Sequence, residues 1–429
     1  MSKPQLAQQE SRAQFTSSPY EPILPAVTSL AEINLLDPDL YHRGDPHAAW
    51  RLLREQAPVF WHEQGSIGTG GKGFWVVTRY DDVRSIYKDS RTFSSEHGPF
   101  LDLSVEGTPR RILASMDGPD HRSHRGLVQR FFAPVALAKF SGSIHKTVTA
   151  LLDGVATRGS CDFSSEIAEK LPITATCDLL GISTAETQHL AEMVLQIESS
   201  DLDALAAYNA AVLAFFNDLT EQRRREGRSD TIVDIVANAE VDGEAVSRED
   251  ISHLLWNLFL GGIDSTAHAA TGALLALFQH PDQLAILTRE PALVGGAIEE
   301  LFRWTSTSHA NKRYVTRDVE VGGVKMHRGD YVSMWTPSAN RDEAAFEEPY
   351  RFDVRRTFPR PHAAFGIGGA HHCLGAYFAR LEMKILFEQM FARFPDIQLA
   401  GPAVRSKAYT MLISPITSLP IKFTPRRRS

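Results

Sequence analysis

The spacing of apolar and polar residues changes along the chain, and in the N-terminal part it predicts short helices beside a pair of strands. A helical pattern opens at Asp45-Pro46, and Pro58 stops it. Residues 59–61 and 74–77 are predicted to form two strands, because apolar residues alternate there around a glycine-rich turn. Residues 80–88 follow with the spacing of a short helix.

The middle of the chain has the spacing of helices throughout. Residues 135–245 are predicted to be largely helical, with breaks near three glycines, Gly159, Gly181 and Gly227. Ser247, with Asp250 three residues later, has the pattern of a helix cap and predicts a long helix that reaches about Gln279.

Strand signals return in the C-terminal third. Residues 319–332 are predicted to form strands around turns, and residues 409–413 and 416–422 closing strands. Residues 93–115 contain Gly and Pro and are too long for a simple connector, so we expect a functional loop there. The patterns together predict a mainly α protein with a small β region.

A glycine-rich loop places one thiol at the start of a helix. Gly366, Gly368 and Gly369 precede Cys373, and a helical apolar pattern begins at Leu374. The free N–H groups and the positive end of the helix dipole are expected to lower the pKa of the thiol. Such a thiolate can serve as a nucleophile, a redox group or an axial metal ligand. The alternative is a small buried residue that closes a helix N-terminus.

The long helix breaks two local rules at its centre. Gly261 and Gly262 lie in the helix interior, where each glycine costs roughly 1 kcal/mol relative to Ala. Asp264 follows among apolar neighbours, where a carboxylate without a partner is costly. Adjacent violations of this kind indicate a functional site. The alternative is that the glycines let another helix cross closely and that Asp264 has a hydrogen-bonding partner that caps it.

Two further charged pairs have helical spacing. His121 and Arg125 lie four apart after an Asp-Gly-Pro turn, and taken alone they favour a solvated basic helix. Glu300 and Arg303 lie three apart, which is a common surface ion pair and weak evidence by itself.

Composition limits the class of protein. The chain has 429 residues, 43% of them hydrophobic and 23% charged, as in an ordinary globular protein with a large core. A net charge of −7 argues against nucleic acid as a partner. Three cysteines are too few for a disulfide framework, so a cytoplasmic location is expected. Residues 1–30 are polar with prolines and lack an apolar run, so we expect a flexible arm, no signal peptide and no membrane anchor.

The cysteine loop resembles the haem-binding loop of the cytochrome P450 superfamily. The matching positions surround the thiol: Phe365, Gly366, Gly369, His371, Cys373, Leu374, Gly375, Ala379, Arg380 and Glu382. The resemblance implies that Cys373 is the fifth ligand of a haem iron and that Phe365, Gly366 and Gly375 contact the haem. Phe365 lies eight residues before Cys373, one more than the commonest spacing, as in a minority of bacterial members.

The long helix resembles the oxygen-binding helix of the same family. The resemblance implies that Gly261 and Gly262 make room for dioxygen, and that Asp264 and Ser265 form the acid–alcohol pair that delivers protons. The family usually has Thr where Ser265 stands, and Ser lacks the methyl group that restricts the rotamer. Thr266 is the alternative hydroxyl, although a rotation of ~100° per residue turns it away.

The resemblance also assigns the remaining charged residues. His121, Arg125, Arg313 and His371 are implied to hold the haem propionates through charge-assisted bonds. Lys312 and Arg317 are possible substitutes for Arg313. Glu300 and Arg303 are implied to brace the fold, together with a third member. The expected third member is Arg351.

The family resemblance covers residues 35–425 and implies a triangular single haem domain, which we place at residues 31–429. It implies a monooxygenase with haem b that inserts one oxygen atom from dioxygen into a small or medium organic substrate. Electrons are expected from a separate ferredoxin and its NAD(P)H-dependent reductase, docked on a basic neighbourhood of Arg110, Arg111, Arg122 and Arg130. Oxidative coupling, desaturation, a peroxygenase, or a haem sensor or carrier without turnover remain alternatives.

The residues expected at the substrate are apolar or small. They lie within residues 93–115 and 305–311 and at Leu258, Gly261, Gly262 and Met411-Leu412. They predict a largely apolar ligand of terpene, fatty acyl, steroid or macrolide type.

Overall fold

The computed structural model describes residues 25–42, 46–101, 112–195, 202–227, 230–405 and 416–427. Several predictions fall outside these ranges: most of the arm at residues 1–30, the strand at residues 409–413, Arg110, Arg111, and Met411-Leu412.

Helices form most of the described chain, and the short helices near the N-terminus were predicted closely. α3 (Pro46–Gln56) ends before Pro58, and α4 (Tyr80–Lys88) has the predicted bounds. The other α-helices are α2 (Pro38–His42), α5 (Gly118–Val128), α6 (Pro134–Leu137), α7 (Ser141–Ala156), α8 (Lys170–Leu180), α9 (Thr184–Leu195), α10 (Leu202–Glu226), α11 (Ile232–Ala237), α12 (Arg248–Gln279), α13 (Pro281–Arg289), α14 (Val294–Thr305), α15 (Thr336–Ala339) and α16 (Ala376–Arg393).

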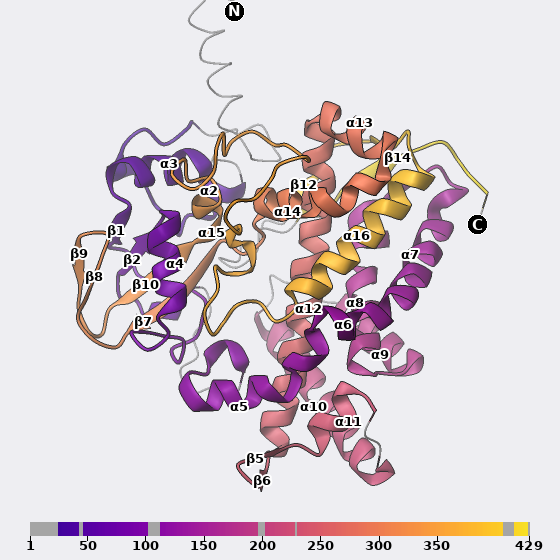
Figure 1. Ribbon diagram of the computed structural model, residues 1–429, viewed down its shortest axis with the longest axis horizontal. Helices are drawn as coiled ribbons and strands as arrows, with labels where there is room; N and C mark the ends of the chain where they lie inside the picture. The colour runs from indigo at the N-terminus through magenta and orange to yellow at the C-terminus, as the bar shows by residue number, and fades with distance from the viewer. Residues whose placement is uncertain are drawn as a thin grey trace, which may run out of the picture.

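The strands of the largest sheet lie mainly at the left of Figure 1, beside α3 and α4. The largest sheet has the order β1-β2-β10-β7-β3, with bounds Val59–His62, Phe74–Val77, Tyr331–Trp335, Ala310–Val315 and Phe93–Ser94. β1 and β2 form the predicted hairpin, and β10 pairs with β2 in parallel. The smaller strands are β4 (Ser160–Asp162), β5 (Glu240–Val241), β6 (Glu244–Ala245), β8 (Val319–Val321), β9 (Val324–Met326), β11 (Gln398–Leu399), β12 (Val404–Arg405), β13 (Ile416–Ser418) and β14 (Pro420–Lys422). The predicted mainly α architecture with a small β region is confirmed.

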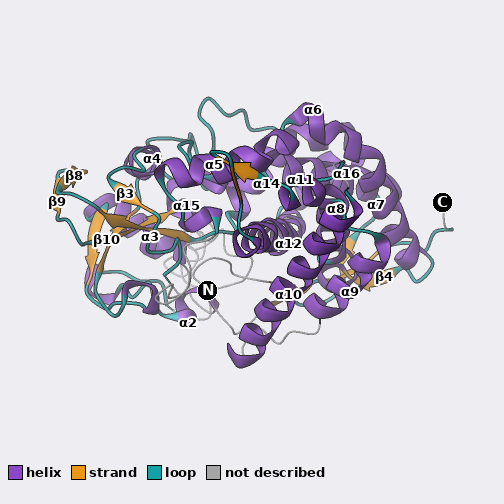
Figure 2. Cartoon of the chain, turned by 90° about the horizontal axis from the view of Figure 1, so that it is seen from below, coloured by secondary structure: helices purple, strands orange, loops and turns teal. Residues whose placement is uncertain are grey.

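α12 is the central helix of the molecule. The Ser247 side chain accepts a hydrogen bond from the Asp250 N–H, so the predicted cap is present. α12 runs for 32 residues and packs against α8, α10 and α14. Figure 2 looks nearly along its axis and shows other helices around it. A helix that is covered on most sides must be apolar over most of its surface, and this explains the weak amphipathic pattern of its sequence.

The Glu300–Arg303 pair is fully buried, and it braces α14. Nε and Nη2 of Arg303 donate to the Glu300 carboxylate at 2.6 and 2.7 Å, and Nη1 donates to the carbonyls of Asn340 and Pro349. Because these carbonyls belong to the segment after α15, one guanidinium ties a helix to a long irregular segment.

The prediction that Arg351 joins Glu300 and Arg303 as the third member of the brace is wrong. The side chain of Arg351 is 60% exposed and pairs with Glu348. Arg356, five residues later, takes the position instead, with its Nε 3.2 Å from a Glu300 oxygen and its side chain only 11% exposed. The irregular segment has no periodicity from which the sequence could show which arginine turns inward.

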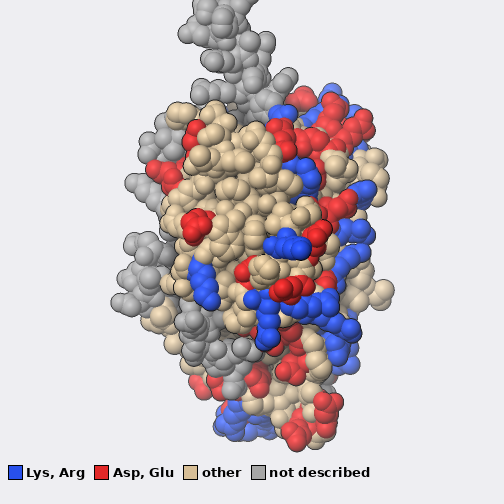
Figure 3. All heavy atoms as spheres, turned by 90° about the vertical axis from the view of Figure 1, so that its left-hand side faces the viewer, with Lys and Arg blue, Asp and Glu red and all other residues tan. Residues whose placement is uncertain are grey.

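On the outer face of the β region, the described residues form no continuous basic surface. Figure 3 shows a largely uncharged centre, with basic and acidic side chains interspersed along one edge. Within the described residues, no helix combines the length and the apolar character that a membrane span requires.

The brace predicts that Arg303, Arg351 and Arg356 contribute differently to the stability of the protein. Arg303→Ala should lower the free energy of unfolding by roughly 3–5 kcal/mol, because it leaves a buried carboxylate without its main partner. Arg351→Ala is the matched control and should stay within about 0.5 kcal/mol of the wild type. Arg356→Ala should cost more than Arg351→Ala. Urea denaturation followed by tryptophan fluorescence measures all three, and equal effects at residues 351 and 356 would contradict the corrected assignment.

Candidate active site

The glycine loop has the backbone shape that the sequence predicted. Gly366, Gly368 and Gly369 have φ angles of 76°, 87° and 82°, in the region that favours glycine. A Cβ on Gly369 would lie 1.9 Å from the Tyr87 carbonyl oxygen, so no other residue fits there. The loop closes on itself where the Cys373 N–H donates to the Phe365 carbonyl at 2.9 Å.

Cys373 lies three residues before α16, and its side chain is exposed to a cavity. Burial raises the pKa of the thiol above its ordinary value, although the N–H groups of Gly375 and Ala376 act in the opposite direction. The predicted lowering of the pKa by the helix terminus is therefore wrong for the chain alone, because desolvation is the larger effect. A metal cation at the sulfur reverses the balance, since a coordinating thiol loses its proton outright.

The cavity, of about 330 Å³, is lined by α12 and by the cysteine loop. Every predicted site residue except Asp264 lines it. Of the residues expected at the substrate, Leu258, Gly261 and Gly262 line the cavity, together with parts of residues 93–115 and 305–311. The sequence therefore identified two of the segments that line the cavity, α12 and the cysteine loop.

The two adjacent glycines of α12 have different neighbours. A Cβ on Gly261 would meet nothing within 4 Å, whereas one on Gly262 would lie 2.7 Å from the Thr176 hydroxyl of α8. Gly261 thus leaves room in the cavity, and Gly262 permits close packing of α12 on α8. Ser265 lines the cavity and donates to the Gly261 carbonyl at 3.1 Å. Thr266 lines the cavity as well, so the rotation that was expected to turn it away does not remove it.

Asp264 does not line this cavity, although the residue as a whole is accessible to solvent. Even so, it is deep in the protein: burial and, to a lesser degree, the charge of Glu169 raise the pKa of Asp264 to about 6. A carboxyl that titrates near neutrality, one residue from a cavity-lining hydroxyl, can exchange protons at physiological pH.

Hydrogen-bond donors and cations line another part of the cavity. His121 is buried and its Nε2 has no hydrogen-bond partner. Arg125 donates to the carbonyl of His372, and Arg313 to the carbonyl of Lys312, but neither has an ion-pair partner among the described residues. Burial, aided by the charges of His371 and Arg125, lowers the pKa of His121 to about 4.

His371 is oriented by two polar neighbours. Its Nε2 lies 3.4 Å from an Asp117 oxygen and 3.2 Å from the Ser95 hydroxyl, and its ring packs 4.3 Å from the ring of His121. The alternatives to Arg313 point elsewhere: Lys312 donates to the carbonyls of Gly68 and His97. Arg317 is 71% exposed. The structure thus brings the four predicted anion-binding residues together.

Sequence reasoning missed some lining residues. Thr176 and Leu179 come from α8, whose sequence carries no distinguishing signal. Glu382 matched the family pattern but received no role, and it is buried in the cavity wall without a hydrogen-bond partner for either oxygen.

The chemistry of the lining fits a flat, carboxylate-bearing ligand with a central metal. The lining offers a single sulfur ligand at Cys373 and open space at Gly261, and the unpaired cations and the His121 Nε2 suit carboxylates. Cys161 and Cys177 are buried and free, and burial raises the pKa of each to about 12, as for inert thiols. Within the described part of the chain, no group of three or more His, Cys, Asp or Glu side chains is arranged so that it could hold a metal ion.

Comparison with known proteins gives consistent matches. The family model described as Cytochrome P450 matches residues 190–399. The chain is 33% identical to Cytochrome P450 NovI of Streptomyces niveus over 92% of this chain and 98% of that protein. It is 32% identical to the Methyl-branched lipid omega-hydroxylase of Mycobacterium tuberculosis over 93% of this chain and 96% of that protein.

The fold is also similar to solved structures. The Mycobacterium marinum cytochrome P450 CYP268A2 in complex with pseudoionone aligns with a TM-score of 0.83 and 28% identity, over 93% of this chain and 100% of that chain. Similarity of this extent covers both the helical part and the sheets.

The loop geometry generates a prediction about glycine. Gly369→Ala should destabilise the protein by more than the ~1–2 kcal/mol cost of a left-handed backbone, because the new Cβ also meets the Tyr87 carbonyl. Gly126→Ala is the matched control: it lies in α5 with nothing near its Cβ and should be neutral or stabilising by about 0.5–1 kcal/mol. Thermal unfolding compares them, and a Gly369→Ala protein as stable as the control would contradict the close approach.

Proposed function

The chain belongs to the cytochrome P450 family of haem-thiolate monooxygenases, and from this premise we propose which residues perform the reaction and what they act on. The observation that carries the proposal is the Cys373 thiol, exposed in a cavity that Gly261 of α12 also lines. Residues of this cavity come from Tyr87 to Glu382, which supports a single haem domain over residues 31–429.

Cys373 is the proximal ligand of haem b in this proposal. His121, Arg125, Arg313 and His371 hold its carboxylates, as supported by the unpaired donors in that part of the cavity. The haem supplies oxygen activation, which no side chain can perform. Phe365, Gly366 and Gly375 line the cavity beside the thiol and pack against the macrocycle.

α12 binds dioxygen and supplies protons. Gly261 leaves space for the gas, and Gly262 lets the helix lie close to α8. Asp264 supplies protons in this proposal, because burial raises its pKa to about 6, close to neutrality, while the residue as a whole keeps access to solvent. Ser265 passes them into the cavity through its hydroxyl, and Thr266 is the second hydroxyl within reach of the same space.

The substrate is a largely apolar molecule of small or medium size. Leu113, Leu179 and Leu258 line the cavity, so apolar contacts dominate away from the cations. The relatives named for methyl-branched lipids and for steroids support a branched or polycyclic hydrocarbon skeleton. The solved complex with pseudoionone supports a terpene-like one.

Electrons come from a separate protein. Bacterial members of the family use redox partners, and we propose a ferredoxin with its NAD(P)H-dependent reductase. Arg122 of α5 and Arg130 are exposed, and the intervening Arg125 bonds next to the cysteine loop, so a basic surface lies beside the thiol for an acidic donor. Three free cysteines support a reducing compartment and hence the cytoplasm.

The ligand assignment is tested by replacing each cysteine. The reduced carbon monoxide complex of the wild type should show the red-shifted Soret band of a haem-thiolate. Cys373→Ser should lose the band and the monooxygenase activity, because the alkoxide-forming side chain does not donate as a thiolate does. Cys161→Ala and Cys177→Ala are the controls and should keep both. A band that survives replacement of Cys373, or a purified protein without haem, would end the proposal.

The proton path is tested at Asp264 and Ser265. Asp264→Asn should slow turnover while substrate binding and haem content stay near wild type, and Ser265→Ala should divert electrons to peroxide. Oxygen uptake, NADH consumption and peroxide yield separate the two effects.

Stability gives an independent check on Asp264. Its pKa rises on folding from 3.8 to about 6, so ionisation opposes folding and stability is lost as pH rises through this range. Asp264→Asn should therefore raise the unfolding temperature at pH 8 and leave it unchanged near pH 3.5. A variant that is both slow and destabilised at pH 8 would point to a structural role instead.

A further inference from the structure

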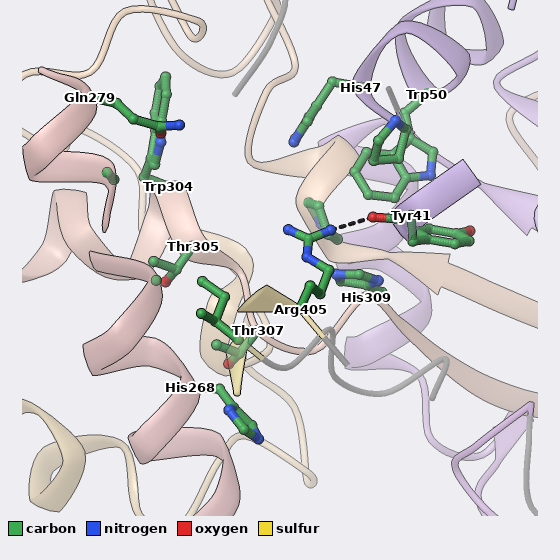
Figure 4. A pocket seen from close by; sticks show the side chains of 15 residues that line it. Tyr41, His47, Trp50, His268, Gln279, Trp304, Thr305, Thr307, His309 and Arg405 are labelled. Atoms are coloured by element: carbon green, nitrogen blue, oxygen red, sulfur yellow. Dashed lines mark hydrogen bonds between the residues drawn. The ribbon is translucent and has the colours of Figure 1, made fainter. Parts of the chain in front are cut away.

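A second cavity, of about 80 Å³, lies beside the active-site cavity, and Thr307 lines both. Figure 4 shows Arg405 and Thr307 between Trp50 and His268, which lie at opposite ends of the space. The polar groups of this cavity therefore do not converge on one ligand atom, and a guanidinium N–H of Arg405 donates to the Tyr41 carbonyl. A converging arrangement of charges lies beside the cysteine loop instead.

Arg380 of α16 folds back toward the cysteine loop. Its Nη1 donates to the Ala376 carbonyl at 3.0 Å, one turn nearer the N-terminus of the helix. Its guanidinium carbon lies 4.4 Å from the centre of the Phe365 ring, and the Phe365 carbonyl accepts the Cys373 N–H. A cation whose side chain is only 27% exposed thus lies against the residue that is bonded to Cys373.

Glu299 of α14 fixes the position of this cation. Its two carboxylate oxygens accept Nε and Nη2 of Arg380 at 2.6 and 2.8 Å, and such a bidentate pair sets orientation as well as distance. Nε2 of His362 lies 3.2 Å from the same carboxylate. Burial acts in the opposite direction, but the hydrogen bonds from Arg380 and His362 lower the pKa of Glu299 to about 2, so the carboxyl is ionised at physiological pH.

The charge of Arg380 also acts on the sulfur of Cys373. Burial raises the pKa of this thiol, and the charges of Arg125 and Arg380 both oppose that effect, because a nearby cation favours the thiolate. Arg125 belongs to the carboxylate-binding residues of the proposed function, whereas Arg380 has no part in them. The contacts of Arg380 therefore leave its charge free to act on the metal ligand.

We propose that the Glu299–Arg380 pair holds a positive charge toward Cys373 and thereby raises the reduction potential of the bound iron. This inference rests on the proposed function. One electron from the donor protein converts the ferric centre to the ferrous one, with no bond formed or broken, and adds one negative charge. A nearby cation favours the reduced form and a nearby anion opposes it. The two residues of this ion pair should therefore act with opposite signs, which a purely structural pair would not do.

Reduction potentials of the haem-loaded proteins test the proposal. Arg380→Met removes the cation, so the ratio of ferric to ferrous protein at the wild-type midpoint should rise about fivefold, or ~40 mV at 59 mV per tenfold for one electron. Glu299→Gln removes the anion and should lower the same ratio. Spectroelectrochemical titration of the Soret band at pH 7.5 measures both.

Two further variants separate charge from packing. Arg380→Lys keeps the charge on a flexible stem, and its potential should lie between those of the wild type and Arg380→Met. Lys384→Met is the matched control, because it removes a cation one turn further along α16 whose side chain is 49% exposed, and it should leave the potential unchanged. Shifts in the same direction for Arg380→Met and Glu299→Gln, or no shift for either, would overturn the proposal and leave the pair as a structural link.

The spectrum of the reduced carbon monoxide complex, recorded for each protein, distinguishes the two levels of the argument. If Arg380→Met yields no folded holoprotein, the sign of the Glu299→Gln shift decides. If the haem-thiolate band is present and the potentials do not differ, only the proposal for this pair fails. If the wild type lacks the band, the proposed function fails with it.

Discussion

The buried ion pair between Glu300 and Arg303 is the interaction on which the site depends. Arg303 joins α14 to the irregular segment before the cysteine loop. Glu299, which precedes Glu300 in α14, accepts two hydrogen bonds from the guanidinium of Arg380 in α16. The same guanidinium lies 4.4 Å from the centre of the Phe365 ring. Two consecutive carboxylates on one helix thus hold the chain on both sides of Cys373. The desolvation cost of such charges is offset only when every donor and acceptor is satisfied, which makes this geometry strict.

α12 shows that adjacent departures from a local rule can have separate causes. Gly261 and Gly262 look equivalent in sequence, but one leaves space in the cavity and the other admits the Thr176 hydroxyl of α8. The helix accepts the cost of both because it is surrounded by other helices, so tertiary packing rather than intrinsic propensity keeps it helical. A functional wall is therefore built into the most constrained element of the fold.

Local patterns were sufficient for most of this architecture, and they failed where tertiary context decides. Helix caps, hairpins and the glycine loop are short-range features, so α12, β1–β2 and the tight turns of the cysteine loop followed from the sequence. Arg351 was expected from the family resemblance, but Arg356 turns inward instead, and a segment without periodicity gives no local signal for this difference. The pKa of Cys373 was misjudged because burial is a property of the whole fold. Thr176, which lines the cavity from α8, has no local signal at all.

The charge distribution links the cofactor to the stability of the fold. Arg125 and Arg313 are largely removed from solvent, and burial lowers the pKa of both, which shows that their charged forms are disfavoured there. A protein that buries cations without acidic partners gains when a ligand provides the opposite charges. Any group that binds only the folded chain also shifts the folding equilibrium by mass action. In the proposed holoprotein, the two carboxylates of the haem would pair with these cations and its iron would hold Cys373 as a thiolate, so haem binding would stabilise the folded chain.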